Sequence, residues 1–511
     1  MYSQLQNLYP ILLSDTIVYD RPMMLYIGTG GSLRVLTSGG DDVTLRNVPN
    51  GSTLPILVSK VFATGSTVGN VLATQFDGDV LNYFSTFPSW VLREFSLAFD
   101  AEGAEELGDY EAGTLYFRDS NFNRVPATFS RTTTATRVNE QGLIETVAVN
   151  VPRIDYTDGS AKLLMEPSRT NIIKYSEDFR NTAQAGESRP WFYAAVGTAS
   201  VPIVTHNYAI SPDGTTNATR IQFDLNGGTT SNDVSQVGQD PTITIGVAYT
   251  ATIWLKSADG NSYSVAIDTN GGTDPSLLAT VTNQWQRFQV TTTAITVNGF
   301  LRIRLRGNES TSDSADILAW GAQLEEGSYP TSYIPTAGSA VTRNEDSFQN
   351  NSLGSYFNTN EGSIYWKYTD NPLLLSTVNI NSFGVNEVFG SKYIRYRGRD
   401  DASLIQSTGI ANNISFAGTD IHLLSYSVRW DGTNLSVFGD SSLIDSEPQS
   451  DDFNPVSFGY SSGGIDASVT TKYEKIIFFP TALTDDQCKD LTLDGYDSYE
   501  AMAAALGYTT Y

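Results

Sequence analysis

The sequence predicts an all-β protein made of several domains. Its 511 residues are too many for one hydrophobic core and suggest three or four domains of roughly 100–200 residues each. The 43 glycines, the many Ser, Thr and Asn residues and the 11% of aromatic residues fit short strands joined by polar turns better than helices. Apolar and polar residues also alternate along many short runs, as half-buried strands require. We therefore expect a series of β modules.

The charge of the chain limits its partners. Acidic residues outnumber basic ones by 56 to 31, which gives a net charge of −25. Such a surface repels nucleic acid and anionic lipid, so we expect neither as a partner. A neutral glycan or a basic protein patch is an easier partner, although acidity that serves only solubility is an equal explanation for any single stretch.

Few residues are suited to metal or nucleophilic chemistry. The single Cys488 excludes an intrachain disulfide framework, and the two histidines, His206 and His422, leave little for a zinc site or a Ser-His-Asp triad. The first twenty residues have no basic region and no long apolar run, which predicts no signal peptide. No window approaches about 18 uninterrupted apolar residues, which predicts no membrane insertion.

The first part of the chain, from Met23 to Leu72, reads as small β-hairpins. Leu33 and Val35 alternate with polar residues in one run, and Val43 and Leu45 do so in the next. Glycines between the runs supply the turns. The GTGG segment resembles a phosphate loop only superficially, because no helix follows it.

This region resembles the small spike-base proteins of phage heads and gene transfer agents. The resemblance implies that residues 1–76 form a virion-attachment β-domain that docks on capsid, collar or tail proteins through oligomerisation. The alternative is a generic small β-domain. The matching stretches are Leu25–Gly31, Leu33–Thr44, Asn47–Gly51, Leu54–Pro55 and Ala63–Gly65.

Residues 77–162 are expected to connect this domain to the next. Apolar residues in the first part of the connector are too dense for a free linker, and Pro88 interrupts any helix there. They predict burial against a neighbouring subunit or in a local core.

A long motif spans Phe129–Phe179, and a second one, ILAWGAQLEEGSYPTSYIPT, spans Ile317–Thr336. In the first motif Gly142 separates two strand-like runs. Glu166 and Arg169 are close enough in sequence to organise a domain entrance by charge-assisted hydrogen bonds. The two motifs resemble the opening and closing of a phage-associated jelly roll that is similar to carbohydrate-binding modules. This resemblance implies a carbohydrate-binding-like jelly roll over residues 163–337.

The body of this module shows strands of period two. In TATIWLKS, residues 250–257, Ile253 faces one side, whereas Trp254 shares the opposite, polar side with Thr252 and Lys256. LRIRLRG, residues 301–307, alternates in the same way.

Residues 338–511 predict a third module. The turn Asp431–Asn434 predicts a hairpin, and Thr484 is expected to cap a short helix in a capping box with Gln487. Another short helix is expected at Tyr499–Leu506. The order of these runs resembles concanavalin A-like and laminin-G lectin sandwiches.

Sugar recognition in such sandwiches uses an aromatic face surrounded by hydrogen-bonding side chains. The carbohydrate-binding candidates are Trp254, on its polar strand face, and Trp191 and Tyr193, in a loop-like segment. The alternative is that these rings fill the core or a seam between domains. Structural calcium is a further expectation, with loop oxygens as ligands. Its candidate donors are Asp213, Asp268, Asp274 and Asp313–Asp316.

No catalytic site is expected. The adjacent acids Glu325 and Glu326, and likewise Asp485 and Asp486, would face opposite ways on a strand and could not flank one glycosidic bond without distortion. The strand-borne E-x-D-x-x-E pattern of concanavalin-like glycosidases does not occur in the sequence.

Together the resemblances imply a structural virion protein, namely a head spike, collar fibre or tail fibre. It would be assembled in the bacterial cytoplasm as a homo-oligomer, a trimer or a pentamer, and would present its domains to host surface glycans. The alternatives are a glycan depolymerase and a purely structural capsid decoration protein.

Overall fold

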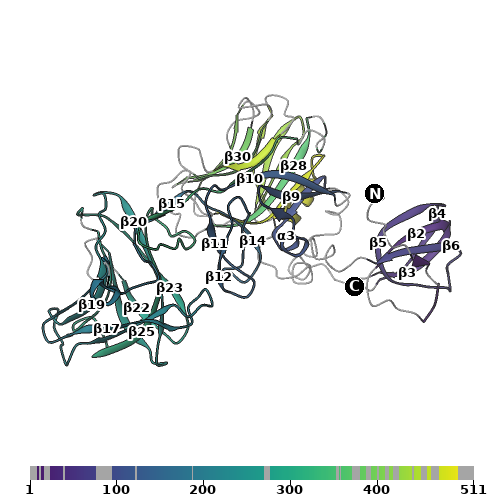
Figure 1. Ribbon diagram of the computed structural model, residues 1–511. Helices are drawn as coiled ribbons and strands as arrows, with labels where there is room; N and C mark the ends of the chain where they lie inside the picture. The colour runs from purple at the N-terminus through teal and green to yellow at the C-terminus, as the bar shows by residue number, and fades with distance from the viewer. Residues whose placement is uncertain are drawn as a thin grey trace.

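The computed structural model confirms the all-β class: strands form nearly all of its regular structure, and its helices are short (Figure 1). Among the described residues, no helix is long and apolar enough to cross a membrane. The structure describes residues 9–10, 13–16, 23–37, 41–75, 95–120, 123–186, 188–269, 277–297, 299–352, 356, 358, 360–370, 380–386, 393–399, 402–408, 414–417, 425–439, 442–449, 457–461 and 471–492.

The N-terminal residues form a six-stranded antiparallel sheet with the order β1-β6-β2-β5-β3-β4. As the alternation predicts, Val35 lies opposite Val43 and Leu33 opposite Leu45 in the β3–β4 hairpin. A side chain at Gly30 would lie 2.2 Å from the carbonyl oxygen of Val48, so the β2–β3 turn requires glycine. The strands are β1 (Tyr9–Pro10), β2 (Met23–Thr29), β3 (Gly31–Thr37), β4 (Asp42–Val48), β5 (Ser52–Val61) and β6 (Gly69–Gln75).

A second unit, here called the host domain, combines strands from both sides of the chain's middle region. Its strands form one hydrogen-bonded network that closes on itself around a core that includes Phe117, Trp366 and Phe478. They are β7 (Leu97–Asp100), β8 (Tyr110–Glu111), β9 (Thr114–Asp119), β10 (Arg124–Ser130), β13 (Ile154–Asp155), β14 (Lys162–Met165), β27 (Ser347–Asn350), β28 (Gly362–Asp370), β29 (Ile380–Asn386), β30 (Tyr393–Arg399), β31 (Ala402–Thr408), β32 (Ile414–Ala417), β33 (Ser425–Trp430), β34 (Asn434–Gly439), β35 (Ser442–Pro448), β36 (Ser457–Ser461) and β37 (Thr471–Phe479).

Two short helices accompany the host domain. Helix α3 (Ala101–Leu107) follows β7, and α5 (Asp485–Leu491) follows β37. The expected capping box of Thr484 and Gln487 is present, and Cys488 and Leu491 of this helix are buried. The helix expected at Tyr499–Leu506 lies outside the described residues.

The expected connector, residues 77–162, differs from the structure in its described part. Leu97 of β7 lies opposite Phe478 of β37, and Phe129 of β10 lies opposite Phe348 of β27. This part of the chain therefore supplies strands of the host domain. Of the apolar residues expected in a local core or against another subunit, Phe95 is buried in this domain. The others, Val80, Leu81, Phe84, Phe87, Trp90 and Val91, lie outside the described residues.

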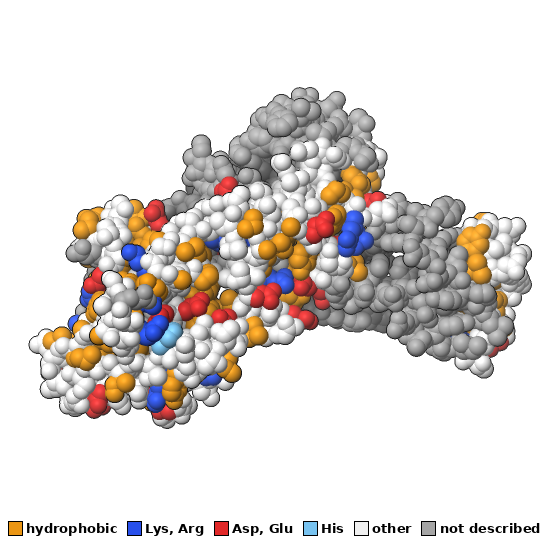
Figure 2. Space-filling view, in the orientation of Figure 1, with side chains coloured by type: hydrophobic (Ala, Val, Ile, Leu, Met, Phe, Trp, Pro, Cys, Tyr) orange, Lys and Arg blue, Asp and Glu red, His pale blue; other side chains and the backbone are white. Residues whose placement is uncertain are grey.

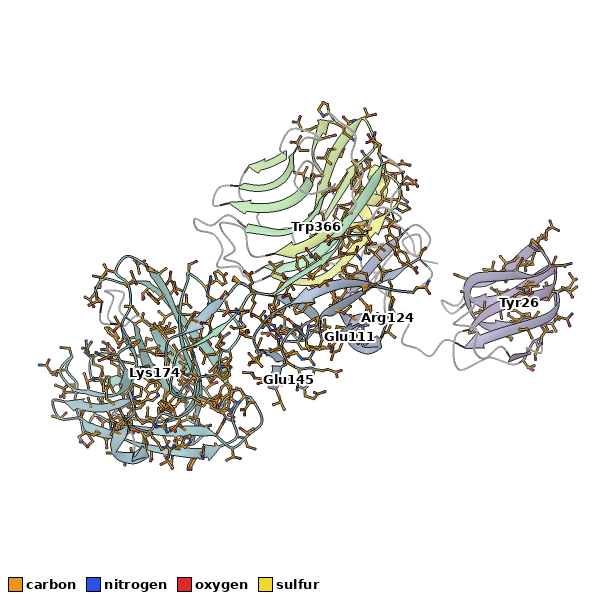
Figure 3. The ribbon with its side chains drawn as sticks, turned by 45° about the horizontal axis from the view of Figure 1, so that its top comes forward. Tyr26, Glu111, Arg124, Glu145, Lys174 and Trp366 are labelled. Carbon is orange, nitrogen blue, oxygen red and sulfur yellow. The ribbon has the colours of Figure 1, made fainter. Side chains whose placement is uncertain are left out.

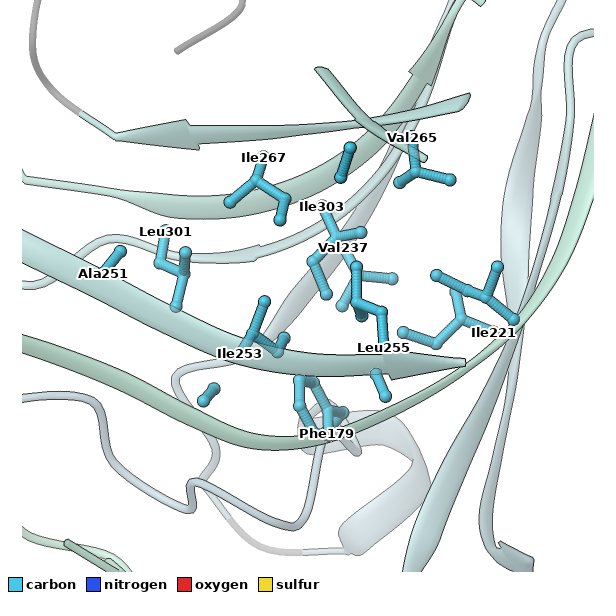
Figure 4. Close-up of a cluster of buried hydrophobic side chains, with 14 of the residues drawn as sticks. Phe179, Ile221, Val237, Ala251, Ile253, Leu255, Val265, Ile267, Leu301 and Ile303 are labelled. Atoms are coloured by element: carbon cyan, nitrogen blue, oxygen red, sulfur yellow. The ribbon is translucent and has the colours of Figure 1, made fainter. Parts of the chain in front are cut away.

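The jelly roll is inserted into the host domain as a sandwich of two five-stranded sheets, β16-β19-β24-β21-β22 and β17-β18-β25-β20-β23. The chain crosses repeatedly between the sheets, apart from the hairpins β17–β18 and β21–β22, which stay within one sheet. The apolar faces of the two sheets enclose the core shown in Figure 4. The bounds are β16 (Phe192–Val196), β17 (Ser200–Ala209), β18 (Ala218–Asp224), β19 (Val234–Gln239), β20 (Ala248–Ser257), β21 (Tyr263–Thr269), β22 (Leu277–Val281), β23 (Gln286–Thr293), β24 (Leu301–Arg306), β25 (Ser314–Glu326) and helix α4 (Thr182–Ala185).

The insertion begins and ends at one place. The chain leaves the host domain after β14 and returns before β27, and β15 (Arg169–Asn171) pairs there with β26 (Val341–Arg343). A two-stranded hairpin, β11 (Ala135–Val138) and β12 (Ile144–Val147), lies beside the inserted sandwich, and Gly142 takes a positive φ of 78° in its turn. Figure 3 shows Glu145 of this hairpin between the two domains.

The core of the inserted sandwich gives a direct stability prediction. Ile303→Ala should lower the free energy of unfolding by about 2–5 kcal/mol, because Ile303 is fully buried between the sheets and the surrounding residues cannot close the cavity completely. The control, Ile295→Ala, changes a side chain that is 57% exposed and should stay within about 0.5 kcal/mol of the parent. Denaturant unfolding followed by tryptophan fluorescence measures both values, and equal losses would contradict the assigned core.

The shared host domain gives a second prediction. A fragment of residues 163–511 lacks β7, so Ile477 and Phe478 of β37 lose the strand that pairs with them. We expect this fragment to aggregate, whereas residues 95–511 should remain monodisperse in size-exclusion chromatography. Equal behaviour of the two fragments would show that the host domain is complete without its first strands.

Candidate functional site

Five buried charged residues, here called the junction network, join the inserted sandwich to the host domain. Arg131, Arg153, Glu166, Arg343 and Asp346 are each at most 1% exposed. Arg131 Nη1 lies 2.9 Å from Asp346 Oδ1, and Arg153 and Arg343 each place Nη1 at 2.8 Å from Glu166 Oε2. Arg153 also pairs with Asp346. Because both carboxylates are paired, their burial is tolerated.

Backbone carbonyls compensate for the excess of arginines in this network. Arg131 donates to the carbonyls of Thr133 and Ala148, at 3.0 and 2.6 Å, and Arg343 donates to that of Pro167 at 2.7 Å. These bonds fix the direction of the chain on both sides of the insertion.

The ion pairs control the ionisation of Glu166. Burial alone would raise the pKa of its carboxyl, but Arg343, Arg153 and the hydrogen bonds from Ser332 outweigh burial and hold that pKa well below its usual range. Glu166 therefore lies at the domain entrance, as expected, but its charged partners are Arg153 and Arg343 and not Arg169. Arg169 instead donates from Nη2 to the hydroxyl of Tyr329 at 3.1 Å.

The same network positions two neighbouring segments. The backbone N–H of Ser332 donates to Glu166 Oε1 at 2.7 Å, and the Ser332 hydroxyl donates to Oε2 at 2.6 Å. The hydroxyl of Thr136 in β11 donates to the carbonyl of Tyr333 at 2.6 Å. Residues 332–333 are thus tied both to Glu166 and to the β11–β12 hairpin.

A cavity of about 820 Å³ lies between these segments and the outer face of the sheet β17-β18-β25-β20-β23. Both domains and the hairpin contribute to its lining. The side chains from the sandwich include Trp254, Lys256, Trp285, Arg287 and Gln289, and those from the host domain include Asp155, Asp158, Glu166 and Lys472.

Aromatic rings form part of the apolar lining of this cavity. Trp254 makes edge contacts with Trp320 and Tyr333, with ring centroids 5.4 and 5.5 Å apart. Trp320 and Tyr333 are buried, whereas Trp254 and Trp285 are half-buried and line the cavity. The guanidinium carbon of Arg287 lies 4.6 Å from the centre of the Trp254 ring. The cavity therefore offers indole surface beside a cation.

Trp254 lies where the alternation of its strand predicts. Ile253 faces the core, and Trp254 shares the outer face of β20 with Lys256. The prediction did not include Arg287, which lies opposite Trp254 on β23. The alternation of QRFQV places Arg287 and Gln289 on one face, but only the cross-strand register brings that face beside Trp254.

Trp191 does not have the role predicted for it. It is 2% exposed, its ring centre lies 4.5 Å from that of Phe179, and its Nε1 donates to the carbonyl of Tyr175 at 3.0 Å. A ring enclosed in this way has no face for a sugar. The segment around it looks loop-like in sequence, which concealed its burial.

Tyr193 also serves the sandwich. Its ring is half-buried against the core, and its hydroxyl donates to the carbonyl of Phe179 at 2.9 Å. The same oxygen accepts the N–H of Asn181 at 3.0 Å. Its hydroxyl therefore ties a loop to the sheet, and it does not line the cavity that Trp254 lines.

The candidate calcium donors are used in other ways. Asp213 accepts hydrogen bonds from Ser211 and Thr215, and Asp268 Oδ2 lies 2.7 Å from Arg304 Nε. Asp313 accepts the N–H of Gly227, Asp316 pairs with Arg220, and Asp274 lies outside the described residues. Within the described ranges, no three His, Cys, Asp or Glu side chains form a group that could hold a metal ion.

The adjacent acids Glu325 and Glu326 face opposite ways on β25, as expected. Glu325 is fully buried and accepts hydrogen bonds from Thr331 and Gln323. Burial raises its pKa. Asp485 and Asp486 lie in the first turn of α5, not on a strand.

No protein-family model matches the chain, and no curated protein matches it. Among solved structures it is similar to the N-terminal CBM22-1-CBM22-2 tandem domain of Paenibacillus barcinonensis Xyn10C, with 12% identity, coverage of 62% of this chain and 99% of the other, and a TM-score of 0.22. For Trypanosoma rangeli sialidase with the inhibitor DANA the values are 11%, 78%, 98% and 0.21. For a family 32 glycoside hydrolase of Bifidobacterium adolescentis they are 9%, 92%, 99% and 0.17. TM-scores of this size do not establish a common fold.

The junction network predicts a large effect of removing one charge. Asp346→Asn should lower the free energy of unfolding by about 3–5 kcal/mol, because Arg131 and Arg153 lose a buried charged partner. The matched control is Asp240→Asn, whose exposed ion pair with Arg302 should contribute at most about 1 kcal/mol. Denaturant unfolding of the two variants measures the difference, and similar small losses would contradict the importance of the network.

The lowered pKa of Glu166 predicts acid sensitivity. Its stabilising contribution is complete above the ordinary Glu pKa of about 4.3 and is lost as the pH falls further toward the lowered pKa of the folded state. The free energy of unfolding should therefore decrease below that pH, and Glu166→Gln should decrease less steeply than the parent. An unchanged slope would show that other carboxyls account for the acid sensitivity.

Proposed function

We propose that this protein is a non-catalytic structural component of a phage or related virion that binds host surface glycans through the cavity beside Trp254. The observation that carries the proposal is the combination of partly exposed indole rings and polar side chains in one cavity. Saccharides are bound in this way, by stacking of their C–H faces on aromatic rings and by hydrogen bonds from surrounding polar groups.

The dimensions and rigidity of the cavity support this function. Its volume of about 820 Å³ is within the range of small-ligand sites, roughly 300–1,000 Å³. Two of its walls are fixed by Glu166 and Thr136 through direct hydrogen bonds. A wall that is already ordered costs little entropy on binding, which favours recognition of a flexible saccharide.

The carboxylates around the cavity favour binding over hydrolysis. Asp155 and Asp158 both contact Lys472, and Glu166 is held by two arginines. Burial raises the pKa of Asp155, but Lys472 and Thr157 more than offset it, so its pKa is lowered. A glycosidase needs one carboxyl with a raised pKa as general acid. The resolved pKa shifts of the lining carboxyls are in the opposite direction.

The virion part of the proposal rests on the resemblance of the segment Leu25–Gly65 to spike-base proteins. In this proposal residues 1–76 attach the chain to a capsid, collar or tail protein as a trimer or pentamer. The remaining domains then face the host, and several weak glycan sites on one particle act together. Negative-stain imaging of particles labelled at the C-terminus would locate the protein and show its symmetry; label absent from purified particles would contradict a virion role.

The cavity can be tested by closing it. Gln289 is exposed on the edge strand β23 and lines the cavity, so Gln289→Trp should fill the space without removing a buried contact. We expect glycan-array and host-cell binding of the full chain to fall at least tenfold. The matched control is Thr280→Trp, at an exposed position of β22, the edge strand of the other sheet, and it should bind normally.

Three outcomes would contradict the proposal. Equal binding by the Gln289 and Thr280 variants would place the glycan elsewhere. Absence of parental binding to every saccharide and host surface would leave a purely structural role. New reducing ends after incubation with host polysaccharide would instead identify a depolymerase.

A further inference from the structure

We infer that the saccharide bound in this cavity is acidic and that its anionic group lies against Lys256 and Arg287. This inference rests on the proposed function, because it assumes that the cavity binds a glycan. It adds the charge of the ligand, which neither the fold nor the aromatic rings determine. The charge of the ligand follows from which charges around the cavity are already paired.

Most charged side chains around the cavity have partners within the protein. Lys472 Nζ lies 3.0 Å from Asp155 and 3.4 Å from Asp158. Arg137 Nε lies 2.7 Å from Glu145. The negative charge of Glu166 is likewise paired in the junction network. Asp158 also lies 3.3 Å from Lys162 Nζ. Each of these groups therefore has an opposite charge at contact distance within the protein.

Lys256 and Arg287 differ from this pattern. Among the residues that the structure describes, no carboxylate oxygen lies within 4.0 Å of their side-chain nitrogens. Arg287 Nη2 donates to two neutral oxygens, the Thr252 hydroxyl at 3.1 Å and the Thr331 carbonyl at 2.7 Å. Its Nε is buried without a hydrogen-bond partner. The cavity thus has two positive charges that no anion neutralises at contact distance.

The surroundings of Arg287 make this charge costly in the unliganded protein. Burial lowers the pKa of the guanidinium, and the buried Glu325 and Glu166 offset this only in part. The oxygens of Glu325 accept hydrogen bonds from Thr331 and Gln323. A ligand anion would compensate Arg287 through a charge-assisted hydrogen bond, the stronger class of such bonds.

The two cations are placed to receive one sugar. Trp254 pairs with Arg287 across β20 and β23, and Lys256 lies two residues beyond Trp254 on the same face. Lys256 and Arg287 are therefore diagonal neighbours on adjacent strands, with their Cα atoms roughly 7–8 Å apart. The indole of Trp254 lies beside both. A pyranose ring on this indole would place a carboxylate or sulfate substituent within reach of either cation.

The site contrasts with the charge of the whole molecule. The chain carries a net charge of −25, and Figure 2 shows acidic and basic side chains spread over the visible face. Long-range attraction of an anion by such a molecule is weak. Selectivity for an acidic sugar would therefore arise on contact, from Lys256 and Arg287, and would appear in the dissociation rate more than in the association rate.

The test compares each acidic saccharide with its carboxyl-reduced counterpart on one array, using the full-length protein. Such pairs differ only in charge. We expect the parent protein to prefer the acidic member by roughly tenfold or more. Lys256→Gln should remove most of this preference. Its melting temperature should be unchanged, because the Lys256 side chain makes no hydrogen bond or ion pair in the described part of the chain.

Lys174→Gln is the matched control. Lys174 belongs to the inserted sandwich (Figure 3). It is exposed and is not among the residues that line the cavity. It makes the same charge change and should keep the preference. Sulfated saccharides form a further arm, and their binding with the same dependence on Lys256 would identify sulfate as the source of the anion. Equal binding of acidic and reduced members would overturn the inference and leave glycan binding intact. Binding to no saccharide would overturn both.

Discussion

The arrangement of the two large domains depends on one buried set of ion pairs. Arg131, Arg153 and Arg343 enclose Glu166 and Asp346 at the place where the inserted sandwich leaves and re-enters the host domain. Burying these charges gives little net stability by itself. The planar guanidinium groups, however, donate hydrogen bonds in fixed directions, which makes the arrangement of the paired residues specific. The same carboxylate that pairs with two arginines also binds Ser332 in the cavity wall. Domain orientation and cavity shape therefore have a common origin.

This common origin explains where the candidate site lies. The indole of Trp254 belongs to the inserted sandwich, whereas Asp155 and Lys472 belong to the host domain. Neither domain alone encloses the cavity. A glycan bound there would contact both, so the relative position of the domains is part of the recognition surface and does not merely space two independent modules.

Local features of the sequence were sufficient to predict part of the fold and of the candidate site. Alternation along β20 correctly placed Trp254 and Lys256 on an outer face, because that signal is contained within eight residues. Trp191 is enclosed through contacts with Phe179 and Tyr175, which lie outside its own segment and could not be read from it. The role of Tyr193, whose ring is half-buried in β16, stays a prediction. The pairing of Leu97 with Phe478, which joins the expected connector to the third predicted module, leaves no local trace in the sequence. The position of residues such as Arg287 beside Trp254 can be recognised only when the cross-strand register is known.

The pairing of β7 with β37 also has a consequence for the time at which each part of the protein can fold. During synthesis, residues 169–343 are complete long before Phe478 leaves the ribosome, so the inserted sandwich can fold while its host lacks its closing strand. Once folded, the insert holds Arg169 beside Arg343 and replaces a long flexible loop by a short fixed link. The entropic cost of closing that loop has then already been met by the folding of the insert. The folded insertion therefore shortens the effective loop between β7 and β37, which lowers the entropic cost of pairing these two strands in the nascent chain.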